Sequence, residues 1–339
     1  MLSISSLALA PAGANFFLVS KSLQLFRWIL RLIILLASLN MVRLVTQSLA
    51  KDGLTLESLS ESSYAFGCVT TYLFLIMKRK QLEKLITDLT VIPTEKLKSL
   101  CKRSIVVYTL ITLASVLEWA RWQQMQSSKF FSGDRWHTVV EVAIAFSELF
   151  TDWIPSQVAF YYIMMHLLFA HQENVLRNVI SFKEINRLDF QPFQSGVTLI
   201  HTSFQEFDRL LSIMPLMWFL YGVASCPNYI VSLVTHEHKI ETLFMLIRSM
   251  VLPLLPVMGI SQAQERMSDE VDMQISRMIT SRHITFCEMN YTTRQLESIK
   301  SLRLTAMSFF VLDKSFILSY IGNVLTFAAL FATYAHSKS

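Results

Sequence analysis

The chain has 339 residues, of which 53% are hydrophobic and 16% are charged, and its formal net charge is +5. Soluble domains carry about 25% charged residues, so this balance excludes an ordinary soluble protein and indicates a membrane protein. The four cysteines form no CxxC pair and do not cluster with the histidines, which argues against a disulfide framework and a metal site. We therefore expect no metal and no cofactor.

Seven stretches are apolar and long enough, or nearly long enough, to cross a bilayer. In chain order they are 25–46, 62–77, 104–121, 138–170, 211–235, 242–261 and 305–335. We therefore predict an all-α, seven-transmembrane helical protein. The fourth stretch is longer than one crossing needs, and we expect it to project beyond the bilayer or to bend at Pro155.

The distribution of Lys and Arg predicts the orientation. If the N-terminus is cytosolic, the cytosolic segments hold 20 of the 30 Lys and Arg residues, the external segments hold 6, and the spans hold the other 4. Basic residues are enriched in cytoplasmic loops. We therefore predict that the N-terminus lies inside and the C-terminus outside, which is the reverse of a G-protein-coupled receptor.

The most polar part of the chain is the segment 262–304. Its apolar residues Met267, Val271, Ile275 and Met278 recur at spacings of four, four and three, as on one face of an amphipathic helix. We expect helices there that extend from the membrane into the cytosol.

The C-terminal region carries three short motifs, which are Leu-Asp-Lys-Ser at 312–315, Ile-Gly at 321–322, and Thr-Phe at 326–327 followed by five residues and Thr-Tyr at 333–334. Together they resemble the C-terminal signature of the insect gustatory receptor family. The family has Tyr after the first of these threonines and ends on Gln-Phe, so Thr333 stands where the family has Gln. This motif covers about a tenth of the chain, and the departure at Thr333 bears on gating.

The resemblance implies a ligand-gated, non-selective cation channel in the plasma membrane of sensory neurons, assembled as a homo- or heterotetramer with other gustatory receptors. In the family, the last helix lines the pore, helices four to seven extend into a cytosolic anchor, and a tastant (a sugar or a bitter compound) binds among helices two to six. The corresponding parts here are a cytosolic tail (1–24), six helices with the ligand site (25–261), anchor helices (262–304) and the pore helix (305–339). The partners implied are the tastant, cations and membrane lipid, and no nucleic acid.

A line of polar side chains runs along the last predicted helix. Ser319, Asn323, Thr326, Leu330 and Thr333 are spaced four, three, four and three, which places them on one helix face. Polar groups are costly against lipid unless they are paired but not against water, so we predict that these residues line the pore, with Leu330 as a hydrophobic constriction. The alternative is ordinary packing, since Ser, Thr and Asn also hydrogen-bond between membrane helices.

Asp313 and Lys314 lie at the inner end of the same stretch. Charged groups at this depth usually pair. We expect a structural pairing within the anchor, and the alternative is attraction of ions at the inner mouth of the pore.

The fourth stretch carries Glu141, Glu148 and Asp152 on one face, followed by Trp153. Carboxylates near the outer leaflet suit sugar hydroxyls or a cationic bitter compound, and aromatic rings at the same level offer stacking or cation–π surfaces. The predicted ligand-binding residues are Trp119, Trp122, Glu148, Asp152, Trp153, Tyr229 and Arg248. The alternative is a structural ion pair, for which Arg248 is a partner, together with interfacial aromatic residues.

Other functions stay open at this point. An odorant receptor of the same superfamily shares the predicted architecture. A G-protein-coupled receptor would have the opposite topology, and the sequence has neither Asp/Glu-Arg-Tyr after the third span nor Asn-Pro-x-x-Tyr in the last. A transporter would need broken helices at the midplane, for which only Pro253 and Pro256 give a basis. An enzyme is not expected, because no catalytic pair or metal cluster is visible.

Overall fold

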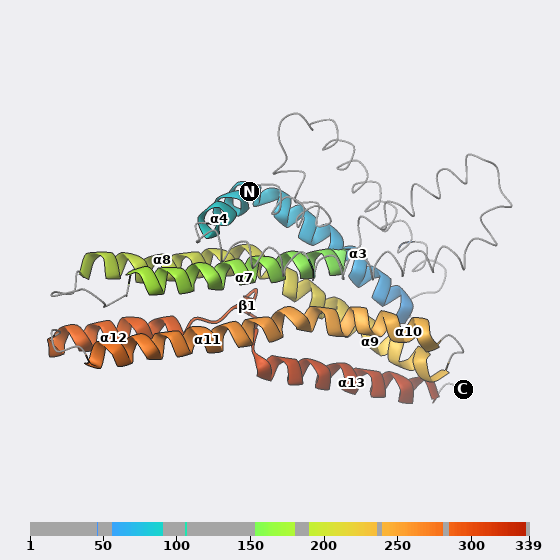
Figure 1. Ribbon diagram of the computed structural model, residues 1–339. Coiled ribbons are helices and arrows are strands. Elements are labelled where there is room, and N and C mark those ends of the chain that lie inside the picture. The colour runs from blue at the N-terminus through green and yellow to red at the C-terminus, as the bar shows by residue number, and fades with distance from the viewer. Residues whose placement is uncertain are drawn as a thin grey trace.

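The computed structural model describes residues 56–90, 153–179, 190–235, 239–280 and 285–336, together with Thr46 and Val106. These residues are almost entirely helical (Figure 1). Apart from those two single residues, the first and third predicted spans lie outside the described residues, as does the first part of the fourth, up to residue 152. The number of spans and their orientation therefore stay predictions.

The described elements alternate between long helices and short connections. They are α3 (Leu56–Met77), α4 (Arg79–Leu89), α7 (Trp153–Val179), α8 (Phe190–Leu211), α9 (Ile213–Thr235), α10 (Lys239–Leu246), the π-helix η3 (Ile247–Val251), α11 (Leu252–Thr280), α12 (Phe286–Lys300), β1 (Thr305–Ala306), β2 (Phe310–Val311) and α13 (Lys314–His336).

Helix α9 is the centre of the packing. It contacts α3, α10 and α13, while α7 packs along α11 and α8. Around Trp218 of α9, the ring of Tyr161 lies 5.5 Å away at a near-perpendicular angle, and the indole N–H donates to the side-chain oxygen of Gln157 at 3.2 Å. Edge-to-face rings with a satisfied indole N–H are a stable way to bury Trp, so this contact fixes α9 against α7.

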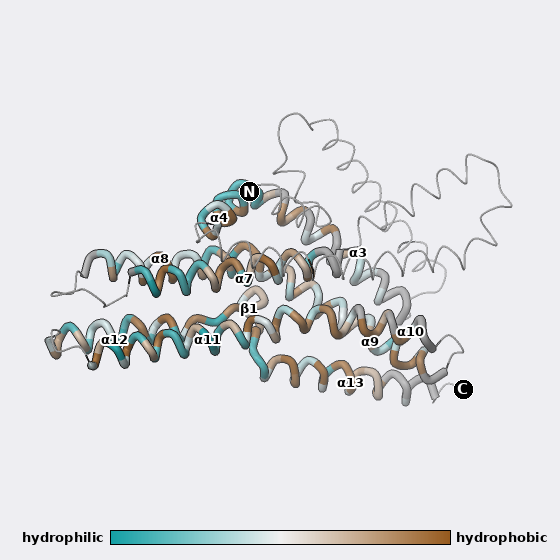
Figure 2. The backbone as a smooth tube through the Cα atoms, in the orientation of Figure 1, coloured by the Kyte–Doolittle hydropathy of each residue, from teal (hydrophilic) through white to brown (hydrophobic). Residues whose placement is uncertain are grey.

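By length and composition, α9 is the one helix among the described residues that qualifies as a membrane span, over Ile213–Leu233. The apolar part of α13, Lys314–Leu330, is slightly shorter. Figure 2 shows α13 as mostly hydrophobic, whereas hydrophilic residues recur along α12 and the adjoining part of α11. The predicted sixth stretch is not one regular helix, because η3 joins α10 to α11 within it. Proline has no backbone N–H to donate to the preceding helical turn, and the π turn just before Pro253 accommodates this missing hydrogen bond.

The amphipathic pattern predicted in 262–304 is confirmed. Met267, Val271 and Met278 of α11 are buried, and Ile275 packs against the same core. Helix α12 then runs back along α11 and α8. It begins at a capping box in which the Thr285 hydroxyl accepts from the Glu288 N–H and the Glu288 carboxylate accepts from the Thr285 N–H. This box satisfies two otherwise unpaired amides at the helix start.

The prediction of one helix over 305–335 is wrong in its first residues. Thr305 pairs with Val311 and Ala306 with Phe310 in an antiparallel hairpin, and α13 begins only at Lys314. The tertiary contacts explain the difference, because Leu304, Ala306 and Leu312 are fully buried. Their alternation buries one face of an extended chain, which a sequence window scored for hydrophobicity cannot distinguish from a helix.

Candidate functional site

Helix α13 has one packed face and one open face. Tyr320, Val324 and Ala328, spaced four apart, are buried where α13 packs on α9. All five residues of the predicted line, Ser319, Asn323, Thr326, Leu330 and Thr333, are exposed. We call these five residues the polar stripe. At 100° per residue, the centre of the stripe lies about 140° around the helix from the centre of the packed residues.

The hydroxyls of the stripe donate back to their own helix. Thr326 donates to the Gly322 carbonyl at 2.8 Å, Ser319 to the Ser315 carbonyl at 3.1 Å, and Thr333 to the Ala329 and Leu330 carbonyls at 2.8 Å. In the described part of the chain, no stripe side chain bonds to another helix. A hydroxyl that has donated its proton still has acceptor lone pairs, and hard cations prefer oxygen ligands. The stripe therefore presents acceptor oxygens outward.

Apolar side chains flank the stripe. Leu318 is 75% exposed and Leu325 is 54% exposed on one side, and Phe327 is exposed on the other. Exposed apolar surface of this kind marks a face that contacts protein or lipid. The open face of α13 is thus a polar strip between two apolar margins.

Gly222 of α9 sets the rotation of α13. A β-carbon at this position would lie 1.6 Å from the Tyr320 hydroxyl oxygen and 3.2 Å from the Ser249 carbonyl oxygen. The Tyr320 ring also packs on Phe219, with 5.1 Å between ring centroids. Because only glycine leaves this space, Tyr320 can lie between α9 and η3, which keeps the polar stripe out of the packed contact between α9 and α13.

The N-terminal end of α13 is connected to helix α8 through the hairpin. The Asp208 carboxylate accepts from the Thr305 N–H and from the Thr305 hydroxyl, each at 2.7 Å. Burial raises the pKa of Asp208, and the two Thr305 hydrogen bonds partly offset that rise. These bonds hold β1, and with it the approach to α13, on α8.

Asp313 and Lys314 have separate structural roles. Asp313 caps α13, because its carboxylate accepts from the Phe316 N–H at 2.9 Å and from the Ser315 hydroxyl at 2.6 Å. Lys314 forms an ion pair with Glu265 of α11. The expected pairing with the anchor segment is therefore present for Lys314, but both its side chain and that of Glu265 are exposed, so the pair contributes little stability.

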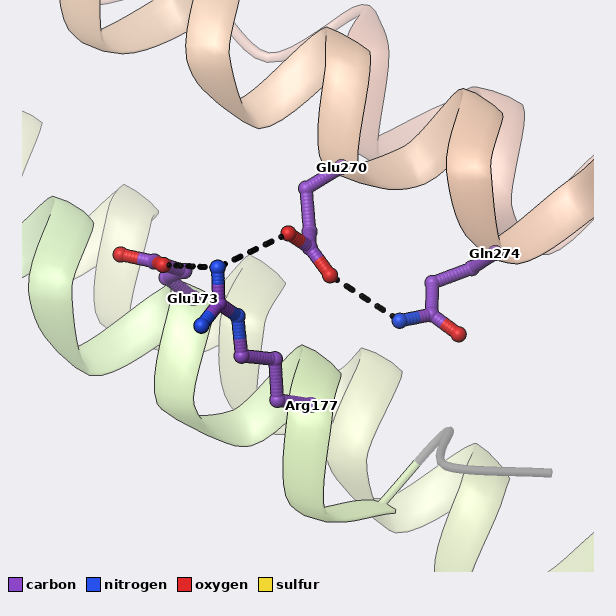
Figure 3. A network of polar contacts seen from close by, with 4 residues as sticks. All are labelled: Glu173, Arg177, Glu270 and Gln274. Carbon is purple, nitrogen blue, oxygen red and sulfur yellow. Dashed lines mark hydrogen bonds and ion pairs between the residues drawn. The ribbon is translucent and has the colours of Figure 1, made fainter. Parts of the chain in front are cut away.

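A second ion-pair network joins α7 to α11 (Figure 3). Arg177 pairs with Glu173 at 2.7 Å and with Glu270 at 3.2 Å, and the Gln274 amide donates to Glu270 at 3.0 Å. The Glu270 side chain is only 8% exposed, whereas that of Arg177 is 52% exposed. A buried carboxylate is tolerated here because it has both a cation and an amide as partners.

Most of the predicted ligand-binding residues lie outside the described part of the chain. This holds for Trp119, Trp122, Glu148 and Asp152, while Trp153 begins α7 and Arg248 lies within η3. Tyr229 lies within the described helix α9, where its hydroxyl is 3.3 Å from the Tyr221 hydroxyl.

Tyr229 belongs to a larger cluster between α3 and α9. The Tyr221 ring meets the Tyr64 ring at 5.5 Å between centroids, and Ser60 donates to Ser225 at 2.7 Å. Sequence reasoning missed these four partners. The signal that would have found them is the spacing of four between Tyr221, Ser225 and Tyr229, matched by Ser60 and Tyr64 on α3.

No protein-family model and no curated protein matches this sequence. The fold, in contrast, is similar to the insect olfactory receptor OR5 from Machilis hrabei, with a TM-score of 0.70 at 14% identity over 93% of this chain and 90% of that chain. The same receptor in complex with eugenol gives a TM-score of 0.71 at 13% identity, over 94% of this chain and 91% of that chain. This likeness shows the fold, and it confirms the prediction of a predominantly helical protein.

Proposed function

We propose that the protein is a chemosensory receptor that is itself a ligand-gated, non-selective cation channel. The observation that carries this proposal is the polar stripe, five exposed residues on the face of α13 opposite its packing against α9. An apolar helix that keeps acceptor oxygens on an outward face is suited to line a water-filled path. The apolar margins beside the stripe are suited to contact neighbouring copies of α13.

In the proposed channel, several copies surround a central axis. The family resemblance of the C-terminal region favours a homo- or heterotetramer with seven spans per subunit, the N-terminus inside and the C-terminus outside. Leu330 forms a hydrophobic ring that closes the path by dewetting. A ligand opens it by binding the open arrangement more tightly than the closed one.

The ligand proposed is a small organic molecule from outside the cell. Support comes from the OR5 likeness, since that receptor is described in complex with eugenol. Within the described residues, the cluster of Ser60, Tyr64, Tyr221, Ser225 and Tyr229 offers hydroxyls beside aromatic rings. Such a mixture of an apolar lining and a few polar groups is typical of small-molecule sites.

The gustatory branch is favoured over the olfactory branch only by the Leu-Asp-Lys-Ser motif at 312–315. The two branches predict different ligands, namely sugars or bitter compounds on one side and volatile compounds on the other. A screen of both classes on cells that express the receptor, read as current, tests this choice. We place the protein in the plasma membrane of sensory neurons on the same resemblance.

Cysteine accessibility tests the pore. In cells that respond to a ligand, Thr326→Cys is expected to lose current when a charged thiol reagent is applied, because the modified side chain obstructs the path. Leu325→Cys is the matched control, since Leu325 is exposed on α13 but lies off the stripe. Equal effects at both positions, or no effect at Thr326→Cys in responding cells, would exclude this face as the pore lining.

A further inference from the structure

A pocket of about 400 Å³ lies between α9, the β1–β2 hairpin and α13. We call it the inner pocket. Its apolar wall includes Phe219 of α9, Phe310 of β2 and Phe316 of α13, and its polar wall includes Asp313, Ser319 and Asn323. The volume falls at the lower end of small-molecule sites, which measure about 300–1,000 Å³. None of these residues was expected to form a binding pocket from the sequence.

The apolar wall is aromatic. The ring centroids of Phe219 and Phe316 are 4.4 Å apart, and those of Phe310 and Phe316 are 5.5 Å apart. Phe310 is also exposed, so its ring is accessible to a ligand. Aromatic faces attract organic cations within about 6 Å through the ring quadrupole.

The polar wall carries a negative charge. Asp313 is the charged side chain among the described residues that line the pocket. Its pKa is lowered, chiefly by the Ser315 hydroxyl and further by the Phe316 N–H and the charge of Arg303, while burial opposes this shift. The carboxylate is therefore ionised at neutral pH.

The basic residues nearby are held outside the pocket. Lys314 pairs with Glu265 on α11, and the Arg303 guanidinium donates to the backbone carbonyls of Lys300 and Leu302. Neither basic side chain lines the pocket. An anionic headgroup would be repelled by the Asp313 carboxylate, and a purely apolar chain would make no favourable interaction with that charge.

We propose that the inner pocket binds a small amphiphilic organic cation, with its ammonium or guanidinium group at Asp313 and its apolar body against Phe219, Phe310 and Phe316. Ser319 and Asn323 belong both to this pocket and to the polar stripe. A cation bound here occupies the inner end of the stripe. In the proposed channel it would block the current from the cytosolic side, and this consequence rests on the proposed function.

Binding is tested first, without any current. The full-length receptor in lipid nanodiscs is titrated by calorimetry with 4-phenylbutylamine, which is protonated at pH 7, and with 4-phenylbutanol as its uncharged counterpart. The amine is expected to bind at least about fivefold more tightly than the alcohol, because Asp313 is half-buried and a charge pair that is partly shielded from water is worth about 1 kcal/mol or more. Equal affinities, or no saturable binding of the amine, would overturn the proposal.

Two variants locate the site. Asp313→Asn removes the charge but keeps the cap of α13, because Asn caps helices as well as Asp does, and it is expected to abolish the preference for the amine. Asp269→Asn removes an exposed carboxylate on α11 outside the pocket and should leave that preference unchanged. If both variants behave alike, the cation binds elsewhere and the proposal fails.

The aromatic wall is tested by Phe310→Leu, which keeps an apolar side chain but removes the ring face. A loss of affinity of about threefold is expected for the amine and not for the alcohol, and this variant also keeps the proposal testable if Asp313→Asn fails to fold. Current in inside-out patches is then recorded with the amine on the cytosolic face. Binding without block counts against the channel function, whereas absence of binding counts against the inner pocket.

Discussion

The hydroxyl oxygen of Tyr320 lies 1.6 Å from the point that a β-carbon on Gly222 would occupy. This close approach of α13 to α9 decides which face of α13 is packed and which is open. The orientation of the polar stripe therefore depends on a residue that lies on a different helix, about a hundred positions earlier in the chain.

Gly222→Ala is expected to destabilise the protein by about 1–3 kcal/mol, the usual cost of overpacking a core. Thermal unfolding of the purified protein in detergent measures this. Adding Tyr320→Leu should recover part of the loss, because it removes the atoms that the new methyl group meets. The control is Gly322→Ala on α13, whose β-carbon would meet nothing within 4 Å. A neutral Gly222→Ala would show that α13 does not depend on this contact.

In the proposed channel, Leu330→Ala is expected to raise the current that flows without ligand, because a smaller side chain weakens a dewetting constriction. Whole-cell recording of unstimulated cells, normalised to surface expression, measures this current. Leu325→Ala is the matched control, since Leu325 and Leu330 have similar exposures of 54% and 60% but only Leu330 is on the stripe. A larger basal current in the control than in Leu330→Ala would contradict the assignment of the gate.

Arg177→Met is expected to destabilise the protein more than Glu270→Met does. Arg177→Met leaves the mostly buried Glu270 carboxylate without its cation, at a cost of about 1–3 kcal/mol. Glu270→Met leaves Arg177 without this partner, but the Arg177 side chain is half exposed and is solvated by water. Glu173→Gln should cost less than about 1 kcal/mol, because it removes only the outer ion pair of the network. Chemical unfolding of the three variants in detergent ranks them, and the reverse order would show that Glu270 is not the constrained partner.

Asp208 gives the stability of the protein a pH dependence of predictable sign. Its pKa in the folded state is raised from 3.8, so the folded state takes up a proton at a higher pH than the unfolded state does. From pH 7 down towards pH 4, the stability of the wild type should therefore increase relative to that of Asp208→Asn. Unfolding midpoints of both proteins across this range test the prediction, and a constant difference would contradict it.

Acid lowers the stability of the folded state through two other carboxyls, Glu288 and Asp313. The pKa of Glu288 is lowered by the Thr285 backbone and hydroxyl hydrogen bonds, and that of Asp313 chiefly by the Ser315 hydroxyl. Stability contributed by these groups is present above their unfolded pKa values and is lost as the pH falls through the lower folded ones. The increase in stability that protonation of Asp208 brings is therefore expected only above about pH 4, where carboxyls of ordinary pKa remain ionised.

The sequence alone determined the features that depend on local periodicity. The spacing of Met267, Val271 and Met278 was enough to predict the buried face of α11, because the helix period decides which residues share a face. The spacing of Ser319, Asn323, Thr326 and Thr333 likewise predicted that these residues share one face of α13. The apolar stretch 211–235 likewise predicted helix α9.

Only the tertiary structure decided which of those faces are open and where the last helix begins. The hairpin replaces helix at 305–311 because burial of Leu304, Ala306 and Leu312 and the bonds of Asp208 to Thr305 outweigh local helix preference. The polar stripe is exposed because Gly222 admits Tyr320. The inner pocket joins residues of α9, the hairpin and α13. These results depend on contacts between positions far apart in the chain, which a local pattern does not encode.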